Sequence, residues 1–310
     1  MAKVMNLTPV HASSIPDSFL LPADRLHPAT TDVSLPIIDM SRGRDEVRQA
    51  ILDSGKEYGF IQVVNHGISE PMLHEISERN KLFCGSAFET LGEKYWIDVL
   101  ELLYPLPSGD TKDWPHKPQM LREVVGNYTS LARGVAMEIP RLCEGGLRQT
   151  SLSGTSEAVV VADINYYPPS PNPSRTLGLP PHCDRPYDRP PPGPSGLEIA
   201  YKGGWIKVQP VPNSLVINFG LQLEVVTNGY LKAVEHRAAT NFAEPRLSVA
   251  SFIVPADDCV VGPAEEFVSE DNPPRYRTLT VGEFKRKHNV VNLDSSINQI
   301  ININNNQKGI

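Results

Sequence analysis

His182 and Asp184 place two metal-binding side chains two residues apart, within the segment Leu177-Gly-Leu-Pro-Pro-His-Cys-Asp184. In an extended segment such residues point to the same side, so the imidazole and the carboxylate can reach one metal ion. A third ligand must come from a distant part of the chain, and His236 is the candidate. Two histidines and one carboxylate on one side of a metal are typical of non-haem Fe(II) oxygenases. Because the motif is short, the three residues taken alone fit an ordinary structural role better than an iron site.

Four further residues have types and spacing that suit a small carboxylic acid. Arg246 and Ser248 lie two apart in a predicted strand, so a guanidinium fork and a hydroxyl share one face. Asn165 and Tyr167, again two apart, can hydrogen-bond the same acid. Taken singly, each residue also fits an ion pair or a place in the core, but their order and spacing together favour a binding site. The chain lacks a glycine-rich dinucleotide fingerprint, which argues against NAD or flavin as the source of electrons.

The region 35–150 follows an extended leader (1–34) in which four prolines disfavour a helix. Apolar residues three and four apart predict a long amphipathic helix, and β-branched runs predict two strands before it. The predicted helix covers 117–143, and the two predicted strands cover 35–40 and 60–65. His66 closes the second strand, where a buried histidine is more often hydrogen-bonded than metal-bound, so we favour a structural role for it.

The region 151–290 consists of short apolar runs separated by turns that contain proline and glycine. Such regular spacing predicts a sandwich or jelly roll. The predicted strands cover 158–167, 196–201, 205–208, 214–219, 223–227, 231–237 and 246–254. The polar, Asn-rich residues 291–310 predict a loosely ordered tail. We therefore expect an α+β chain in which a helical N-terminal domain (35–150) precedes a jelly-roll domain (151–290).

The composition argues against several classes of protein. A net charge of −7 without a basic stripe argues against nucleic-acid binding. No apolar run approaches membrane-spanning length, and the first residues lack the apolar core of a signal peptide. The four cysteines are scattered without a C-x-x-C pair, which predicts neither zinc nor disulfides and indicates a reducing compartment, most simply the cytosol. We expect a cytoplasmic monomer that acts on a small molecule.

Taken together, these motifs resemble those of the plant 2-oxoglutarate- and Fe(II)-dependent dioxygenases, over most of residues 30–290. The similar motifs are Leu35-Pro-Ile-Ile-Asp39, Gly59-Phe-Ile-Gln-Val-Val-Asn-His-Gly67, Asn165-Tyr-Tyr167, His182-Cys-Asp184, His236 and Arg246-Leu-Ser248. The resemblance implies a double-stranded β-helix (jelly-roll) core and an iron ion held by His182, Asp184 and His236. It further implies that 2-oxoglutarate chelates the metal and that Arg246 and Ser248, helped by Tyr167, hold its far carboxylate. The implied oxidant is O2, with ascorbate as reductant.

Some stretches of the sequence indicate more closely which class of substrate the resemblance implies. Within the family they are most similar to enzymes of grasses that act on phytosiderophores. These stretches are Gly43-Arg-Asp-Glu-Val47, Gly92-Glu-Lys-Tyr-Trp96, Tyr201-Lys-Gly-Gly-Trp-Ile-Lys207 and Leu223-Glu-Val-Val-Thr-Asn-Gly229. The implied substrate is a mugineic-acid-type phytosiderophore, a polycarboxylate amino acid that chelates iron.

Three segments depart from the family pattern, and they suggest alternative functions for the chain. The segment 76–83 is shortened, 140–159 is scrambled, and 185–195 is so rich in proline that it cannot form a central strand. Frameshifts or mistaken splice boundaries are one interpretation, and the jelly roll would then be incomplete around 185–195. The alternative function is a catalytically impaired relative. A cupin-like binding module without oxygen chemistry is a third hypothesis, but it would not need Arg246 and Ser248.

Overall fold

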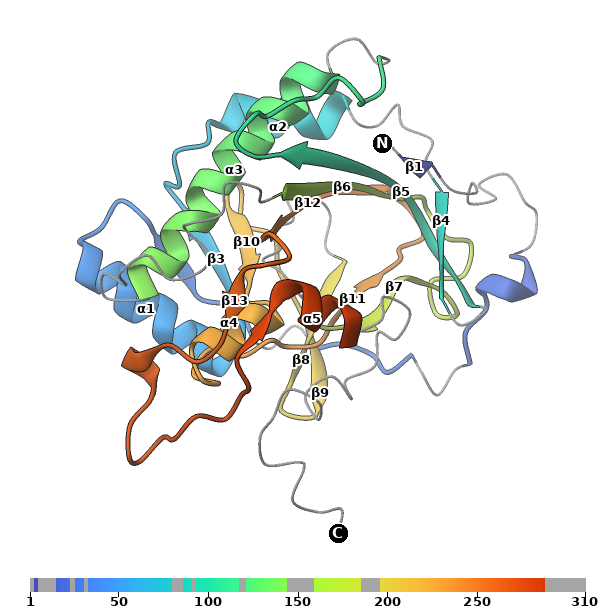
Figure 1. The fold of residues 1–310 in the computed structure, drawn as a ribbon. Coiled ribbons are helices and arrows are strands. Elements are labelled where there is room, and N and C mark those ends of the chain that lie inside the picture. Colours follow the sequence, from blue (N-terminus) through green and yellow to red (C-terminus); the bar gives the residue numbers. More distant parts are fainter. Residues whose placement is uncertain are drawn as a thin grey trace.

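The structure, a computed structural model, combines helices with antiparallel sheets, as expected for an α+β protein (Figure 1). It describes residues 3–4, 15–22, 26–30, 33–79, 86–90, 93–116, 121–143, 159–184 and 196–287. The predicted tail at 291–310 and the Pro-rich segment 185–195 lie outside the described residues, as do 80–83 and 144–158 of the other two altered segments.

The larger sheet has the strand order β1-β5-β6-β12, with β4 paired to β5. Its strands are β1 (Lys3–Val4), β4 (Ser86–Thr90), β5 (Glu93–Pro105), β6 (Val159–Tyr167) and β12 (Arg246–Val254). The β6–β12 pairing is antiparallel and unbroken, from Tyr167 opposite Arg246 to Val159 opposite Val254. The sequence predicts β6 and β12, but it does not predict β5.

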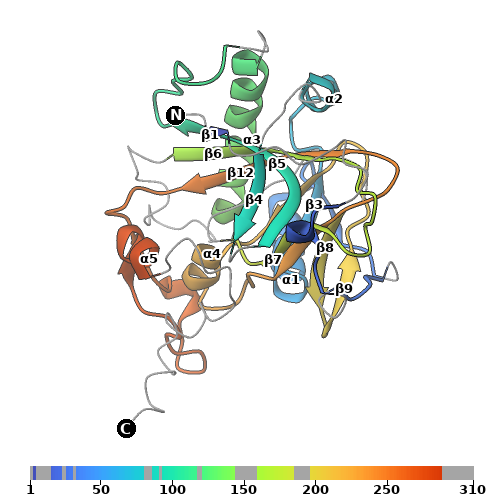
Figure 2. The ribbon, with the colours of Figure 1, turned by 90° about the vertical axis from the view of Figure 1, so that its right-hand side faces the viewer.

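Alternation along these strands separates two faces of the larger sheet. The outer face presents buried apolar side chains to α3 (Leu121–Cys143), which lies across it (Figure 2). These residues are Leu100, Leu102, Val160, Ala162, Ile164, Leu247 and Val249. The inner face instead carries polar residues, among them Asn165 and Ser248, that line a cavity. The period of two therefore places core residues on one side and candidate binding residues on the other.

A smaller sheet, with the order β7-β11-β8-β9, faces this inner surface across the cavity. Its strands are β7 (Leu177–His182), β11 (His236–Ala239), β8 (Leu197–Tyr201) and β9 (Gly204–Lys207). In the β7–β11 pairing His182 lies directly opposite His236. The strand predicted over 231–237 therefore begins only at His236, at the end of that segment.

The N-terminal elements are joined to the C-terminal ones through shared sheets. β2 (Ile37–Asp39) runs parallel to β3 (Phe60–Val64), and β3 pairs antiparallel with β10 (Leu215–Asn218). Helices α1 (Arg44–Glu57) and α2 (Glu70–Arg79) pack against α3. The long predicted helix is confirmed as α3, although Leu131, assigned to its apolar face, is 43% exposed.

The strand predicted over 223–227 is wrong, because Leu221–Val226 form a short buried helix, α4. A short apolar run fits a buried helix as well as a buried strand, so its pattern cannot decide between them. Helix α4 packs with β13 (Val260–Val261) and with α5 (Val281–Lys287), which follows β14 (Leu279–Thr280). Among the described helices, none is long and apolar enough to cross a membrane.

Candidate metal centre

His182, Asp184 and His236 converge at one point between the two sheets. One potential ligand atom from each residue lies within 4.8 Å of the other two. The Nε2 atoms of His182 and His236 lie 3.4 and 3.3 Å from separate oxygens of Asp184. Two imidazoles and a carboxylate that face one point make a donor set suited to a divalent first-row metal such as Fe(II). The residues present therefore fit an iron ion.

The backbone orients both imidazole rings toward this point. The Nδ1 atom of His182 lies 2.8 Å from the carbonyl oxygen of Pro180, and that of His236 lies 3.4 Å from the carbonyl of Val234. A carbonyl can only accept, so Nδ1 carries the proton and Nε2 presents its lone pair to the centre. Phe60 packs edge-on against the His236 ring, at 5.3 Å between ring centroids.

Asp184 follows the end of β7, yet two contacts hold it in place. Its side chain accepts a hydrogen bond from Nδ2 of Asn218, and its carbonyl oxygen accepts one from the backbone N–H of Leu221 at 2.9 Å. Asn218 ends β10, which is itself paired to β3. Described residues therefore hold both the side chain and the backbone of this ligand.

The charges at the centre depend on one another. Burial by itself would raise the pKa of Asp184, but the facing histidines hold it well below its usual range. Burial would lower the pKa of His182, but the hydrogen bond and the negative charge of Asp184 raise it. The carboxylate is therefore ionised at neutral pH, as a metal ligand must be.

Arg246 and Ser248 lie on the inner face of β12, on the same cavity as the metal centre. The Nη1 atom of Arg246 donates to Oγ of Ser248 at 3.3 Å, and its guanidinium lies 4.9 Å from the ring centroid of Tyr167. All three residues are buried. Asn165, which is opposite Ser248 in the β6–β12 register, lines the same cavity. The structure therefore brings together all four residues that were selected for binding a small acid.

Two glycines leave room for this arrangement. A Cβ atom on Gly178 would lie 2.4 Å from the Tyr167 ring, and one on Gly196 would lie 2.9 Å from Cδ of Arg246. Both distances are far below van der Waals contact, so any side chain there would displace the ring or the arginine. These glycines show no obvious motif in the sequence, and only the tertiary contacts explain them.

The cavity has a volume of about 560 Å³ and is mainly apolar apart from these groups. Cavities of this size hold small organic ligands. Its lining also contains Glu101 of β5 and Asp163 of β6, which sequence reasoning missed. The available signal was the single acidic residue in the predicted strand 158–167; the segment of β5, which has several charged residues, gave no such signal.

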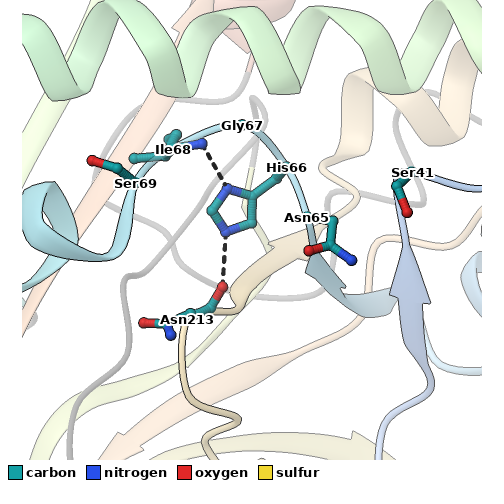
Figure 3. Close-up of a pocket in the computed structure, with 7 residues that line it drawn as sticks. All are labelled: Ser41, Asn65, His66, Gly67, Ile68, Ser69 and Asn213. Atoms are coloured by element: carbon teal, nitrogen blue, oxygen red, sulfur yellow. Dashed lines mark hydrogen bonds between the residues drawn. The ribbon is translucent and has the colours of Figure 1, made fainter.

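His66 has a structural role, as the sequence favoured, and Cys183 is not one of the clustered ligands. The His66 ring is held between the backbone N–H of Ile68, at 3.2 Å, and the carbonyl oxygen of Asn213, at 2.9 Å (Figure 3). Its pocket is separate from the metal centre. The thiol of Cys183 contacts the carbonyl oxygen of Ala233 at 3.7 Å, and burial raises its pKa to about 12. Neither residue belongs to the ligand cluster found among the described residues.

Comparison with family models yields two matches. Residues 159–255 match the 2OG-Fe(II) oxygenase superfamily, and residues 35–90 match the N-terminal region described as "non-haem dioxygenase in morphine synthesis N-terminal". The first match contains the metal centre together with Arg246 and Ser248. Both matches fall within the range over which the motifs resemble the plant dioxygenases.

Individual proteins are similar over the whole chain. The chain is 86% identical to mugineic-acid 3-dioxygenase and 48% identical to 2′-deoxymugineic-acid 2′-dioxygenase, both from Hordeum vulgare, with all of each chain covered. The first alignment spans 338 positions, against 310 residues in this chain, so 28 positions are gaps here. The crystal structure of JOX2 in complex with 2OG, Fe and JA is 30% identical, with a TM-score of 0.78 over 89% of this chain and 90% of that one.

Proposed function

Because this chain belongs to the 2OG-Fe(II) oxygenase superfamily and is a 2-oxoglutarate-dependent dioxygenase, we propose that it hydroxylates a mugineic-acid-type phytosiderophore. The observation that carries the reaction type is the convergence of His182, Asp184 and His236 beside an arginine-lined cavity. The substrate class is supported by 86% identity to a protein named mugineic-acid 3-dioxygenase.

His182, Asp184 and His236 hold Fe(II) in this proposal. Their backbone and Asn218 contacts keep the three ligand atoms directed at one point, so little reorganisation is needed on binding. The three ligands come from one side, which leaves the cavity side of the metal for 2-oxoglutarate and O2.

Arg246 holds the far carboxylate of 2-oxoglutarate, with Ser248 beside it and Tyr167 and Asn165 on the neighbouring strand. The guanidinium is buried, is braced by the Tyr167 ring and already donates to Ser248. A buried arginine held in this way offers two parallel donors to a carboxylate. The surrounding apolar lining excludes water from the co-substrate and strengthens these interactions.

Iron with 2-oxoglutarate supplies the oxidising chemistry, in which one O2 converts a substrate C–H to C–OH while 2-oxoglutarate becomes succinate and carbon dioxide. The protein residues orient both organic molecules toward the metal. Ascorbate serves as the external reductant. The protein acts as a cytoplasmic monomer on small molecules, without nucleic acid or membrane, which the scattered cysteines and acidic net charge support.

The test is succinate formation from 2-oxoglutarate with Fe(II), ascorbate and mugineic acid. We expect mugineic acid to stimulate succinate formation and to gain one oxygen atom by mass spectrometry. The His182→Ala variant should lose both signals, whereas His66→Ala serves as a control on a histidine outside the site. Undiminished turnover by His182→Ala would reject the assigned ligand set, and turnover without oxidation of mugineic acid would reject the substrate.

The impaired relative and the cupin-like binding module are not favoured. An impaired copy would not be expected to keep the metal ligands, the contacts that orient them and Arg246 together in one cavity. A pure binding module has no need for an arginine braced against Tyr167 and directed into the same cavity as the ligands.

A further inference from the structure

Glu101 and Asp163 form a pair of carboxylates on the inner face of the larger sheet. They are direct partners in the antiparallel β5–β6 register, so their Cβ atoms lie about 5 Å apart. Both line the cavity that contains the metal centre. Like charges directly opposite each other destabilise a sheet. On its other side Glu101 lies opposite Lys3 of β1, a residue of opposite charge, whereas Asp163 lies opposite Ala250 on its other side.

Asp163 has no partner that would explain the pairing. Its Oδ1 atom is enclosed and makes no hydrogen bond with any described residue. Of the basic residues that line the cavity, Arg237 is paired with Glu198 at 2.8 Å and Lys285 with Asp257 at 2.6 Å. Arg246, the third, stacks on Tyr167 at one end of β12. Lys3 of β1 lies opposite Glu101 in the β1–β5 register, whereas none of the described basic residues that line the cavity is paired with Asp163.

The environment makes this carboxyl group hard to ionise. Burial, together with the charges of Glu101 and Asp184, raises the pKa of Asp163 to about 7. Its neighbours along the inner face are Val161 and Asn165 on the same strand and Ala250 opposite it on β12. A mainly apolar wall with one acidic pair matches a ligand that has a short carbon chain next to a positive charge.

We infer that Glu101 and Asp163 bind a protonated amine of the organic substrate near the middle of the inner face, while Arg246 binds the carboxylate of 2-oxoglutarate at the end of β12. Ala250, opposite Asp163, is four residues from Arg246 along β12, which corresponds to about 13 Å. His182 and His236 of the smaller sheet line the same cavity. An amine bound by the acidic pair would hold the carbon atoms next to it toward the metal. This inference rests on the proposed function, because it assumes an organic substrate in this cavity.

The separation of the acidic pair from Arg246 also predicts which substrates the cavity prefers. An amino acid substrate would place its ammonium group at the acidic pair, whereas an uncharged analogue would leave the enclosed Oδ1 atom of Asp163 without a partner. A substrate with a single carboxylate and no amine would be repelled from the pair. The substrate class that the cavity selects is therefore an amine with carboxylate groups.

The test is calorimetric titration of the full chain, loaded with Fe(II) and 2-oxoglutarate without oxygen, with mugineic acid and with its N-acetyl derivative. We expect Asp163→Asn and Glu101→Gln each to weaken mugineic acid binding about tenfold or more, the usual cost of losing a charged hydrogen bond. The exposed Glu270→Gln is the matched control and should bind as the unmodified protein does. The N-acetyl derivative should bind weakly to the unmodified protein, and the variants should not weaken it further.

Equal affinity of the variants and the unmodified protein would overturn the inference, and so would tighter binding of the N-acetyl derivative. Absence of binding by the unmodified protein would overturn it too. Succinate formation, measured in parallel, tests the proposed function separately. Amine binding that depends on Asp163 without succinate formation would reject the reaction but keep the site. Succinate formation together with mugineic acid binding that neither variant weakens would keep the reaction but reject the amine site.

Discussion

Two regions of the cavity lie on one face of one sheet: the arginine end, at Arg246, and the acidic end, at Glu101 and Asp163. Their charged groups differ in whether they already have partners within the protein. At the arginine end, Arg246 contacts Ser248 and Tyr167 before any ligand binds. At the acidic end, Asp163 faces Glu101 and its Oδ1 has no partner among the described residues. In the proposed function, the arginine end is preorganised for a constant co-substrate, whereas the acidic end would be completed by the substrate itself.

Removal of the metal ligand between the two ends should have the largest effect. We expect Asp184→Ala to lose Fe(II) binding in anaerobic equilibrium dialysis. Loss of a residue that only supports a metal ligand costs up to roughly 100-fold, so loss of the ligand itself should reduce succinate formation by more than that. The comparison of the ends would then no longer apply, because neither ligand would be oriented by a metal. Wild-type iron binding by this variant would contradict the assignment.

Substitution of Arg246 tests the arginine end alone. Truncation of a buried, hydrogen-bonded charge costs about 2–5 kcal/mol, so Arg246→Leu should raise the KM for 2-oxoglutarate about 30-fold or more. Arg246→Lys should lose less, because it keeps the charge but not the planar fork. Equal KM values for 2-oxoglutarate in all three proteins would contradict the proposed role of this arginine.

Asn218 sharpens the comparison, because it supports the metal without facing either end. Its hydrogen bond to Asp184 fixes that carboxylate, and loss of such a support costs about 10–100-fold in metal affinity. We expect Asn218→Ala to weaken Fe(II) binding in this range in the same dialysis experiment. Added Fe(II) should restore the rate of succinate formation, whereas a rate that stays low at saturating iron would indicate a different role.

The smallest predicted effect concerns stability at the acidic end. The pKa of Asp163 is 3.8 when unperturbed and about 7 in the folded protein, so the unfolded chain releases its proton first as pH rises. Folding therefore loses stability between about pH 4 and pH 7 through this group. Asp163→Asn should raise the melting temperature at pH 8 more than at pH 5, by about 2–4 °C for each kcal/mol recovered.

Other titratable groups line the same cavity and also affect how stability depends on pH. They are Glu101, Tyr167, His182, Cys183, Asp184, His236, Arg237, Arg246 and Lys285. All of them remain in Asp163→Asn, so the difference between the two melting curves reports Asp163 together with its interactions with Glu101 and Asp184. A pH-independent difference would contradict a raised pKa, and a lower melting temperature at pH 8 would show that the carboxylate stabilises the fold.

The contrast between His66 and His182 illustrates what sequence reasoning could predict. Both histidines stand at or just after the end of a strand, and the sequence favoured a structural role for one and a metal role for the other. Both ring nitrogens of His66 face backbone groups, whereas the Nε2 of His182 faces Asp184. The distinction was available because His182 has a carboxylate two residues away, and that spacing is a local property.

Elements that depend on distant contacts were harder to predict. Helix α4 is buried on all sides, so its apolar run carries no period to separate helix from strand. Strand β5 carries Glu101 on its inner face, and this charge interrupts the apolar pattern of a core strand. Asp184 is held by Asn218 and Leu221, which come from elements more than 30 residues away, so no local pattern could predict these contacts.

The sequence by itself determined the candidate ligands His182 and Asp184, the Arg246–Ser248 pair and the class of fold. Side-chain chemistry and the two-residue period of a strand are properties of short segments, so they can be recognised without coordinates. Only the tertiary structure decided that Glu101 lies opposite Asp163 and that Gly178 makes room for Tyr167. Strand pairing and close packing join segments far apart in the chain, and no local pattern specifies which of them meet.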